Sequence, residues 1–184
     1  MNSHGLTLIE LLIVVAITAI LAAVAAPSFS TMLRSQHVTG EVNTLVVLIY
    51  LARSEAIKRN QVVTICKSAD KQNCGGNWSD GWIVFSDKNA DGARDADEIV
   101  ITSGQLGNNY LLSWSAFGSD NYIRFRTSGL TSSHNGTFKL CPDDGDERFA
   151  RAVIVSKTAR VRTSEDSNGD GIEEDSSGDN LVCS

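Results

Sequence analysis

The sequence lacks the features that mark a fibrous, disordered or nucleic-acid-coating chain. Two prolines and 15 glycines among 184 residues exclude a collagen-like repeat and a long proline-rich linker. Basic residues are not in excess, since 16 Lys and Arg stand against 22 Asp and Glu, which disfavours a globally basic nucleic-acid binder. With 42% apolar and 21% charged residues, the composition is that of about one ordinary globular domain.

No catalytic constellation is recognisable. The three histidines, His4, His37 and His134, are scattered along the chain, and none belongs to a nucleophile–base pattern. A glycine-rich loop that would cradle a phosphate is also missing. We therefore expect that the protein is not an enzyme.

Apolar residues are concentrated at the N-terminus. From Leu6 to Ala26 only Thr7, Glu10 and Thr18 are polar, and as a helix this run spans roughly 30 Å, the thickness of a bilayer core. We expect one membrane span here. A cleaved secretory signal is the alternative, because the alanines that end the run offer small-residue cleavage sites. The run is longer than a usual signal core and no Lys or Arg precedes it.

Glu10 is the unusual residue of this span. A carboxylate inside the membrane costs on the order of 3 kcal/mol on insertion scales, so it calls for a partner. If the chain is cut after Gly5, the new amino group on Leu6 lies one helical turn before Glu10, on the same chain or on a neighbouring one. The simpler interpretation is that Glu10 lies at the membrane interface and is solvated.

The run from Gly5 to Val14, with sequence GLTLIELLIV, resembles the prepilin signal of type IV filament systems. The resemblance implies that a prepilin peptidase cleaves between Gly5 and Leu6 and methylates the new N-terminus. It further implies that Glu10 neutralises the N-terminus of an adjacent subunit during assembly. Leu6 departs from the usual Phe, and the leader lacks Lys and Arg, so the positive-inside signal is weak.

A helical pattern continues beyond Pro27 to Asn60, with apolar residues three and four positions apart. The segments that follow resemble the GspH/FimT branch of minor pilins and pseudopilins, and the resemblance covers about residues 5–162. The matching segments are a helix end at 52–60 and strands or turns at 62–66, 78–85, 123–126, 136–141 and 152–156.

The resemblance implies an α+β, type IV pilin-like fold. A long N-terminal helix, transmembrane in its first half, would pack on an antiparallel β-rich head, with Trp78, Trp82 and Trp114 as core and sheet aromatics. The expected division is a leader at 1–5, a transmembrane and filament-core helix at 6–27, an amphipathic continuation at 28–60, a GspH/FimT-like head at 61–162 and an acidic tail at 163–184.

Four cysteines, an even number, follow the membrane span and fit an oxidising compartment. They allow three pairings. Cys66 and Cys74 are close enough in sequence to staple a loop, and Cys141 and Cys183 would then tie the last part of the head to the tail. Zinc is the weaker alternative, since no Cys-x-x-Cys pair occurs and no histidine lies nearby.

Residues 87–98 match the calcium-loop pattern D-x-[DN]-x-[DN]-G-x5-E. The flanking residues indicate strands rather than the helices of an EF-hand, so a hairpin loop that uses Asp and Asn for turn chemistry is the alternative. No cofactor is required, and calcium is the candidate. The pattern would place around one ion oxygens from Asp87, Asn89, Asp91, the Ala93 carbonyl, Asp95 and Glu98.

A second run, from Asp166 to Gly171, has the first half of the same pattern. Its twelfth position is Ser177, so we expect this loop to lack the closing carboxylate and to be the weaker candidate for a metal site.

Arg160 and Arg162 alternate to one face at the end of the last strand. Family members that act in DNA uptake carry Gly-Arg-x-Arg there, whereas this chain has Ala159 in place of the glycine. Two guanidiniums could grip adjacent phosphates, but the tail that follows holds no basic residue and would repel DNA. We expect both arginines to pair with tail carboxylates, which are Glu165, Asp166, Asp170, Glu173, Glu174, Asp175 and Asp179.

The sequence therefore predicts a structural minor pilin or pseudopilin of a type II secretion pseudopilus or a type IV pilus. Its expected partners are other pilins, the prepilin peptidase and the bacterial inner membrane, which it would cross once with its head in the periplasm. A DNA-binding minor pilin that uses Arg160 and Arg162 is the alternative. A calcium-dependent surface protein with an uncleaved anchor is a more distant one.

Overall fold

The structure is a computed structural model that describes residues 7–131 and 133–183. The chain divides into two compact units, the first ending at His37 and the second beginning at Val38. One helix, α1 (Leu8–Arg59), contributes to both and is continuous over Pro27. Each unit is described by itself below.

The N-terminal unit consists of the first part of α1. Thr7 caps the helix, because its Oγ1 accepts a hydrogen bond from the backbone N–H of Glu10 at 3.3 Å. The Thr7 backbone N–H in turn donates to Glu10 Oε2 at 3.5 Å, so the two residues form a capping box. Within the described residues, α1 is the one helix long and apolar enough to cross a membrane.

The second unit begins with the rest of α1, which buries one face. The buried residues recur three and four positions apart, as an amphipathic helix requires. They are Val38, Val42, Leu45, Leu48, Ile49, Ala52 and Ala56. Asn60 ends the helix in the left-handed conformation with φ +49°. Gln61 N donates to Ala56 O at 3.2 Å, the closing bond of a helix C-terminus.

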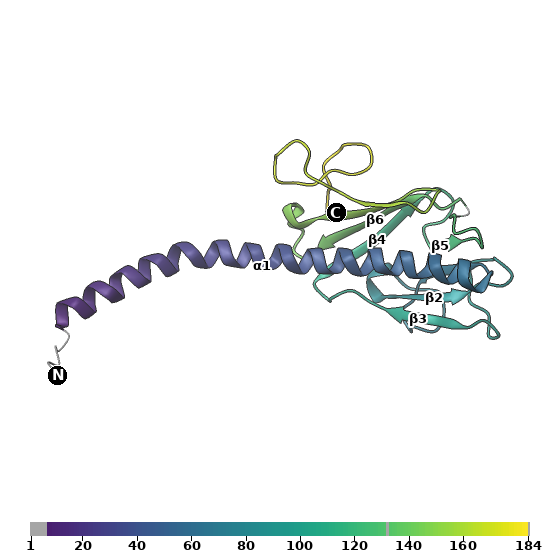
Figure 1. Cartoon of the computed structure of the whole chain (residues 1–184), viewed down its shortest axis with the longest axis horizontal. Coiled ribbons are helices and arrows are strands. Elements are labelled where there is room, and N and C mark those ends of the chain that lie inside the picture. Colours follow the sequence, from purple (N-terminus) through teal and green to yellow (C-terminus); the bar gives the residue numbers. More distant parts are fainter. Residues whose placement is uncertain (1–6, 132, 184) are drawn as a thin grey trace. The chain divides into compact units, whose positions relative to one another are not determined.

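Two four-stranded antiparallel sheets complete this unit (Figure 1). The first has the order β3-β2-β1-β5 and the second the order β4-β6-β7-β8. The first sheet consists of β1 (Val63–Lys67), β2 (Trp82–Ser86), β3 (Val100–Gly104) and β5 (Tyr122–Phe125). The second consists of β4 (Tyr110–Ala116), β6 (Gly136–Pro142), β7 (Arg151–Val155) and β8 (Val161–Thr163). The short helix η1 (Trp78–Asp80) lies between β1 and β2 in the chain, and η2 (Glu147–Phe149) lies between β6 and β7.

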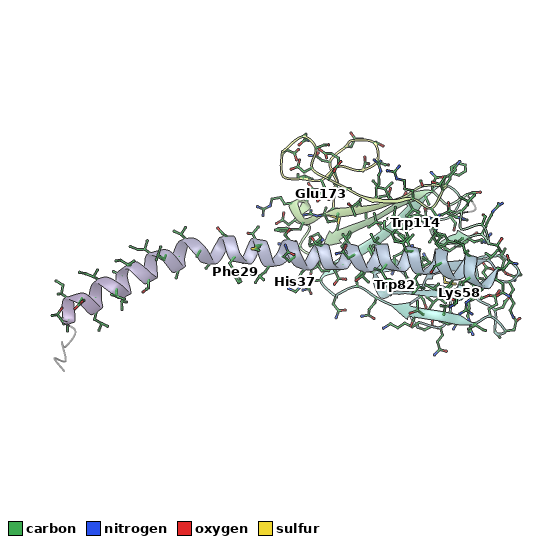
Figure 2. All side chains as sticks on the ribbon, in the orientation of Figure 1. Phe29, His37, Lys58, Trp82, Trp114 and Glu173 are labelled. Carbon is green, nitrogen blue, oxygen red and sulfur yellow. A yellow bond between two sulfur atoms is a disulfide. The ribbon has the colours of Figure 1, made fainter. Side chains whose placement is uncertain are left out.

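The main core lies between the helix and the inner faces of both sheets. All three tryptophans belong to it, with 3–5% of their surface exposed, so the prediction of core aromatics is confirmed. Figure 2 labels two of them, Trp82 and Trp114. Phe138 joins two of them, since its ring centroid lies 4.4 Å from that of Trp114 and 5.1 Å from that of Trp78. The predicted α+β architecture of a long helix with an antiparallel head is confirmed.

Two smaller apolar clusters lie outside this core, and each contains a cysteine pair. Residues that alternate with the core residues of β1, β2 and β5 form the first, which comprises Cys66, Ile83 and Phe85 with Cys74, Val100 and Tyr122 packed against them. The second comprises Cys141, Ala150, Ala152 and Leu181 with Cys183. The loops and the tail therefore cover sheet surface that would otherwise be exposed.

The edge strand β4 has its backbone groups occupied by nearby loops. Ser79 Oγ accepts a hydrogen bond from Leu112 N at 2.9 Å and donates to Leu112 O at 3.3 Å. Asp120 Oδ1 accepts from Ala116 N at 2.9 Å. Tyr110 N donates to Gly107 O at 3.2 Å. These contacts take the place of a neighbouring strand.

Candidate functional site

The predicted cleavage site, Gly5 and Leu6, lies outside the described residues. The described anchor begins with Thr7, and Glu10 stands exposed in the first turn of α1. Among the described residues, the Glu10 carboxylate accepts one hydrogen bond, from Thr7 N, which is long at 3.5 Å. The Glu10 carboxylate is therefore accessible to a stronger partner, such as an ammonium group, at this end of the helix.

Large apolar side chains cover the N-terminal unit all round, and each is between 45% and 77% exposed. They are Leu8, Ile9, Leu11, Leu12, Ile13, Val14, Val15, Ile17, Ile20, Leu21, Val24, Phe29, Met32 and Leu33. A patch of this extent does not stay in water. A helix that is apolar on all sides belongs in lipid or among other helices.

Two disulfides fasten loops onto the second unit. Cys66 of β1 is bonded to Cys74, and Cys141 of β6 is bonded to Cys183 in the tail, with Cα–Cα distances of 5.6 and 5.7 Å. These are the two pairs expected from the sequence. Since all four sulfurs are used and the described residues include no free cysteine, no thiolate is left for zinc.

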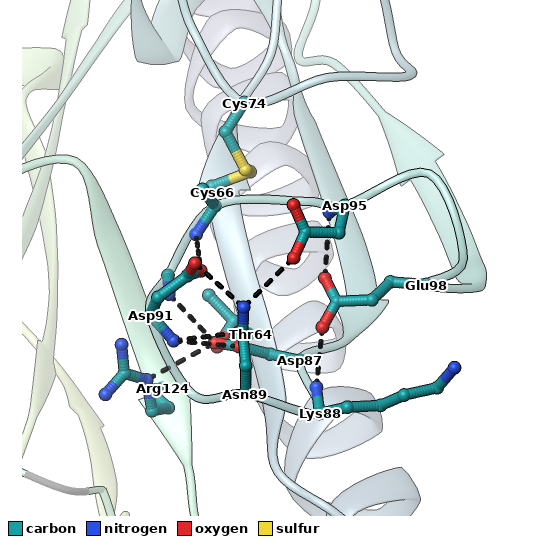
Figure 3. Close-up of polar contacts among 12 residues, drawn as sticks. Thr64, Cys66, Cys74, Asp87, Lys88, Asn89, Asp91, Asp95, Glu98 and Arg124 are labelled. Carbon is teal, nitrogen blue, oxygen red and sulfur yellow. Dashed lines mark hydrogen bonds and ion pairs between the residues drawn. A yellow bond between two sulfur atoms is a disulfide. The ribbon is translucent and has the colours of Figure 1, made fainter.

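Asp87, the first residue of the predicted calcium loop, is fully buried at the end of β2 (Figure 3). Its Oδ2 accepts hydrogen bonds from Thr64 Oγ1 at 2.6 Å and Gly92 N at 3.1 Å. Oδ1 accepts from Asp91 N at 3.1 Å, and the guanidinium Nε of Arg124 lies 3.4 Å from Oδ2. These contacts join the loop to β1 and β5.

Glu98, the last residue of the same loop, closes it onto its own backbone (Figure 3). Oε1 accepts from Lys88 N at 2.6 Å and Oε2 accepts from Asp95 N at 3.0 Å. Between the two ends, the amide of Asn89 donates to Asp91 at 2.9 Å and to Asp95 at 3.0 Å. The loop connects β2 and β3, as the flanking residues predicted, and backbone and amide N–H groups satisfy its carboxylates.

This geometry accounts for the fold of the loop without an ion. Ala93 contributes its N–H, which donates to Asp91 Oδ1 at 2.8 Å. In the part of the chain that the structure describes, no group of three or more His, Cys, Asp or Glu residues is arranged to hold a metal. Calcium binding at this loop stays a prediction.

The second acidic run forms a loop of the same design. Asp166 accepts hydrogen bonds from Gly169 N at 2.7 Å and Gly171 N at 2.9 Å. Glu174, only 6% exposed, accepts from Ser167 N at 2.9 Å, as Glu98 does from the second residue of its loop. The expectation that this loop lacks a closing carboxylate was wrong. The closing residue is Glu174, three positions before Ser177, because this loop is shorter.

The expected pairing of Arg160 and Arg162 with the tail is also wrong. Both side chains are exposed, and neither forms an ion pair among the residues described here. Glu173 is instead held by Arg151 of β7, whose Nε lies 2.9 Å from Oε1, and by the hydroxyl of Ser164. Burial outweighs these two contacts and raises the pKa of Glu173.

Comparison with known proteins then identifies the family. The model of "Type II transport protein GspH" matches residues 41–159, and that of the "Prokaryotic N-terminal methylation motif" matches residues 1–26. The chain belongs to the GspH family. The resemblance of its helix and strands to the GspH/FimT branch is thereby confirmed, and the methylation motif includes the predicted cleavage site.

Solved structures are similar to this GspH-family chain, and those with a TM-score of 0.50 or more share its fold. The type IV minor pilin FimU of Pseudomonas aeruginosa is 17% identical with a TM-score of 0.56, over 71% of this chain and 90% of that one. A second crystal form of FimU gives a TM-score of 0.50 at 18% identity, over 69% and 92% of the two chains. The minor pseudopilin EpsH of the Vibrio cholerae type 2 secretion system is 13% identical with a TM-score of 0.47, over 66% and 90%. No curated protein sequence matches the chain.

Membership of the GspH family supports a structural role in assembly with other pilins, and the solved structures show the shared fold. The family consists of structural subunits and not of known enzymes. The DNA-binding alternative through Arg160 and Arg162 finds no support in these comparisons.

Proposed function

We propose that this GspH-family chain is a minor pilin or pseudopilin that is processed by a prepilin peptidase and anchored in the bacterial inner membrane. The observation that carries the proposal is the methylation motif on residues 1–26, which ends in a helix apolar on every side. A periplasmic head is supported by the two disulfides, since they persist in oxidising compartments. The head is displayed on the filament after assembly.

The proposed processing exposes a new amino group at Leu6. It lies four residues before Glu10, whose exposed carboxylate accepts, among the described residues, only the long hydrogen bond from Thr7 N. An ammonium from an adjacent subunit would offset the cost of this carboxylate in lipid, which is on the order of 3 kcal/mol. Glu10 thereby makes the helix more stable when it packs against a neighbouring subunit than when it is alone in the membrane.

Mass spectrometry of the membrane-extracted protein tests the processing. We expect a mature chain that begins with N-methylated Leu6. A chain that begins after Ala26 would identify an ordinary signal peptide, and an intact Met1 would identify an uncleaved anchor. Either result would overturn the proposal.

Glu10→Gln tests the role of the carboxylate in assembly, because it keeps the shape and removes the charge. We expect normal cleavage and a loss of incorporation into filaments, measured by cross-linking of the variant to other pilins. Thr18→Ala is the matched control on the same helix, since the Thr18 hydroxyl already bonds to the carbonyl of Val14 at 2.9 Å. Normal incorporation of Glu10→Gln would contradict the role.

Deletion of the gene distinguishes the two filament systems. Loss of enzyme secretion with normal surface pili identifies a pseudopilus subunit, and loss of pili with normal secretion identifies a minor pilin. Complementation with the wild-type chain must restore whichever activity is lost. A deletion that leaves both secretion and pili unchanged would contradict the structural role.

A further inference from the structure

A cavity of about 570 Å³ opens beside β5, which is an edge strand of the first sheet. Five separate segments of the chain contribute to its lining. Among the described residues that line it there are two arginines and no carboxylate, although the whole chain carries a net charge of −6. The polar lining residues are Arg124, Arg126, Thr127, Ser133 and His134.

The alternation of β5 places the two arginines on one side of the strand. Ile123 and Phe125 are fully buried in the main core, so Arg124 and Arg126 project from the opposite face. Arg124 is held in place, because its Nε lies 3.4 Å from the buried carboxylate of Asp87 and its guanidinium lies 4.9 Å from the ring centroid of Tyr122. Arg126 follows the strand and is exposed.

His134 adds a buried polar group to the same cavity. The residue is 5% exposed, and its ring lies 4.9 Å from the ring of Tyr122. Among the described residues, the buried His134 Nδ1 has no hydrogen-bond partner, whereas Arg124 Nε has the carboxylate of Asp87 beside it at 3.4 Å. More than nine in ten buried polar groups in proteins have a partner, so His134 stands out as an unsatisfied polar residue in the lining of this cavity.

Burial and the nearby charge of Arg124 lower the pKa of His134, so the imidazole is neutral at neutral pH. A neutral imidazole still donates one N–H, and the hydroxyls of Thr127 and Ser133 add donors that rotate to suit a ligand. The lining is thus rich in donors, and because the buried carboxylate of Asp87 offsets the charge of Arg124, its net positive charge comes from Arg126. A group with several acceptor oxygens and a negative charge matches it on both counts.

We propose that this cavity binds an oxyanion, a phosphate or carboxylate group, through the guanidiniums of Arg124 and Arg126 and the imidazole of His134. The site is separate from the anchor and from both acidic loops. It gives the head a place to hold an acidic ligand even though the protein as a whole repels anions.

Nuclear magnetic resonance of the full chain in detergent micelles, with its histidines labelled in the ring, tests the proposal. Sodium phosphate and sodium acetate are titrated in turn at constant pH and at an ionic strength held with sodium chloride. We expect a saturable shift of the His134 ring signals, while those of His37 stay in place. The anion that saturates at lower concentration identifies the class of ligand.

Arg126→Gln is the deciding variant, because Arg126 is exposed and its replacement leaves the core intact. We expect affinity to fall about tenfold, in line with the loss of one charge-assisted hydrogen bond. Arg160→Gln is the matched control, an exposed arginine outside the cavity, and should bind like the wild type. Thermal melting of both variants confirms that they are folded.

The proposal is overturned if neither anion gives a saturable shift at His134. It is also overturned if Arg126→Gln binds as tightly as the wild type, or if Arg160→Gln weakens binding to the same extent. The first of these two results would exclude Arg126 from the site, and the second would assign the effect to the general positive charge of exposed arginines.

Discussion

Removal of the Cys141–Cys183 disulfide should destabilise the head more than removal of Cys66–Cys74. The two bonds close loops with sequence separations of 42 and 8 residues. Loop-closure entropy then gives stabilisations of about 4 and about 2.5 kcal/mol respectively. For a chain of this size, the corresponding losses of melting temperature are about 8–16 and about 5–10 °C.

The difference assumes that the tail unfolds together with the rest of the head. Contacts other than the disulfide support this assumption. Leu181 is 3% exposed, Cys183 N donates to Glu147 Oε1 at 3.2 Å, and Glu173 is paired with Arg151 at 2.9 Å. A tail held at several points melts with the sheets to which it is attached.

The assay is thermal melting of the full chain in detergent, without reductant, for the two double Cys→Ala variants and the wild type. Limited proteolysis of the Cys141/Cys183 variant is run in parallel. A loss that is equal for both variants, or larger for Cys66/Cys74, would refute the reasoning. So would proteolytic release of residues 163–184 from an otherwise unchanged head, because it would show that the tail is a separate unit.

Three further predictions concern two glycines, Glu173 and the loop 87–98. Gly40→Ala should stabilise the chain by about 1 kcal/mol in urea unfolding, since Gly40 lies inside α1 and an added Cβ meets nothing within 4 Å. Gly129→Ala should destabilise the chain, because Gly129 has φ +75° and an added Cβ would lie 2.7 Å from the Ile57 side chain of α1. The raised pKa of Glu173 means that the folded state holds its proton more tightly than the unfolded state. The stability of the wild type relative to Glu173→Gln should therefore fall as the pH rises above the ordinary glutamate pKa of 4.5, measured by matched melting curves. A chelator should leave the melting temperature unchanged, because N–H donors already close the loop 87–98. A melting temperature that rises when calcium is added, and does not rise in Asp91→Ala, would instead establish the calcium site.

Local signals predicted the helix well. The apolar run and the three- and four-residue apolar spacing placed it at 6–60, and the structure has it at Leu8–Arg59 among the described residues. The strand order of the two sheets was beyond such signals, because pairing depends on contacts between residues distant in sequence. The strand β4 was not identified, since Leu111 is 53% exposed beside the buried Leu112 and blurs the alternation.

Contacts between residues distant in sequence also explain why the predicted ion pairs of the tail were wrong. Arg160 and Arg162 were expected to pair with the tail carboxylates because they come just before the tail, whereas the path of the tail brings Glu173 to Arg151. That path is constrained by the bond to Cys141 and cannot be derived from the tail alone. The sequence did contain a signal for closure of the second acidic loop by Glu174, a glutamate three residues after Gly171. It was missed because the twelve-residue calcium-loop pattern places the closing residue at Ser177.

The occupied edge of β4 has a consequence for the life of the protein before assembly. Anchored chains share a plane, so their heads collide far more often than dissolved domains at the same copy number. An open strand edge would convert such collisions into irreversible strand pairing. With Ser79 and Asp120 bonded to the backbone of Leu112 and Ala116, the β4 edge offers fewer free backbone groups to a colliding head. The two polar side chains thereby protect one of the four sheet edges, the others being β3, β5 and β8.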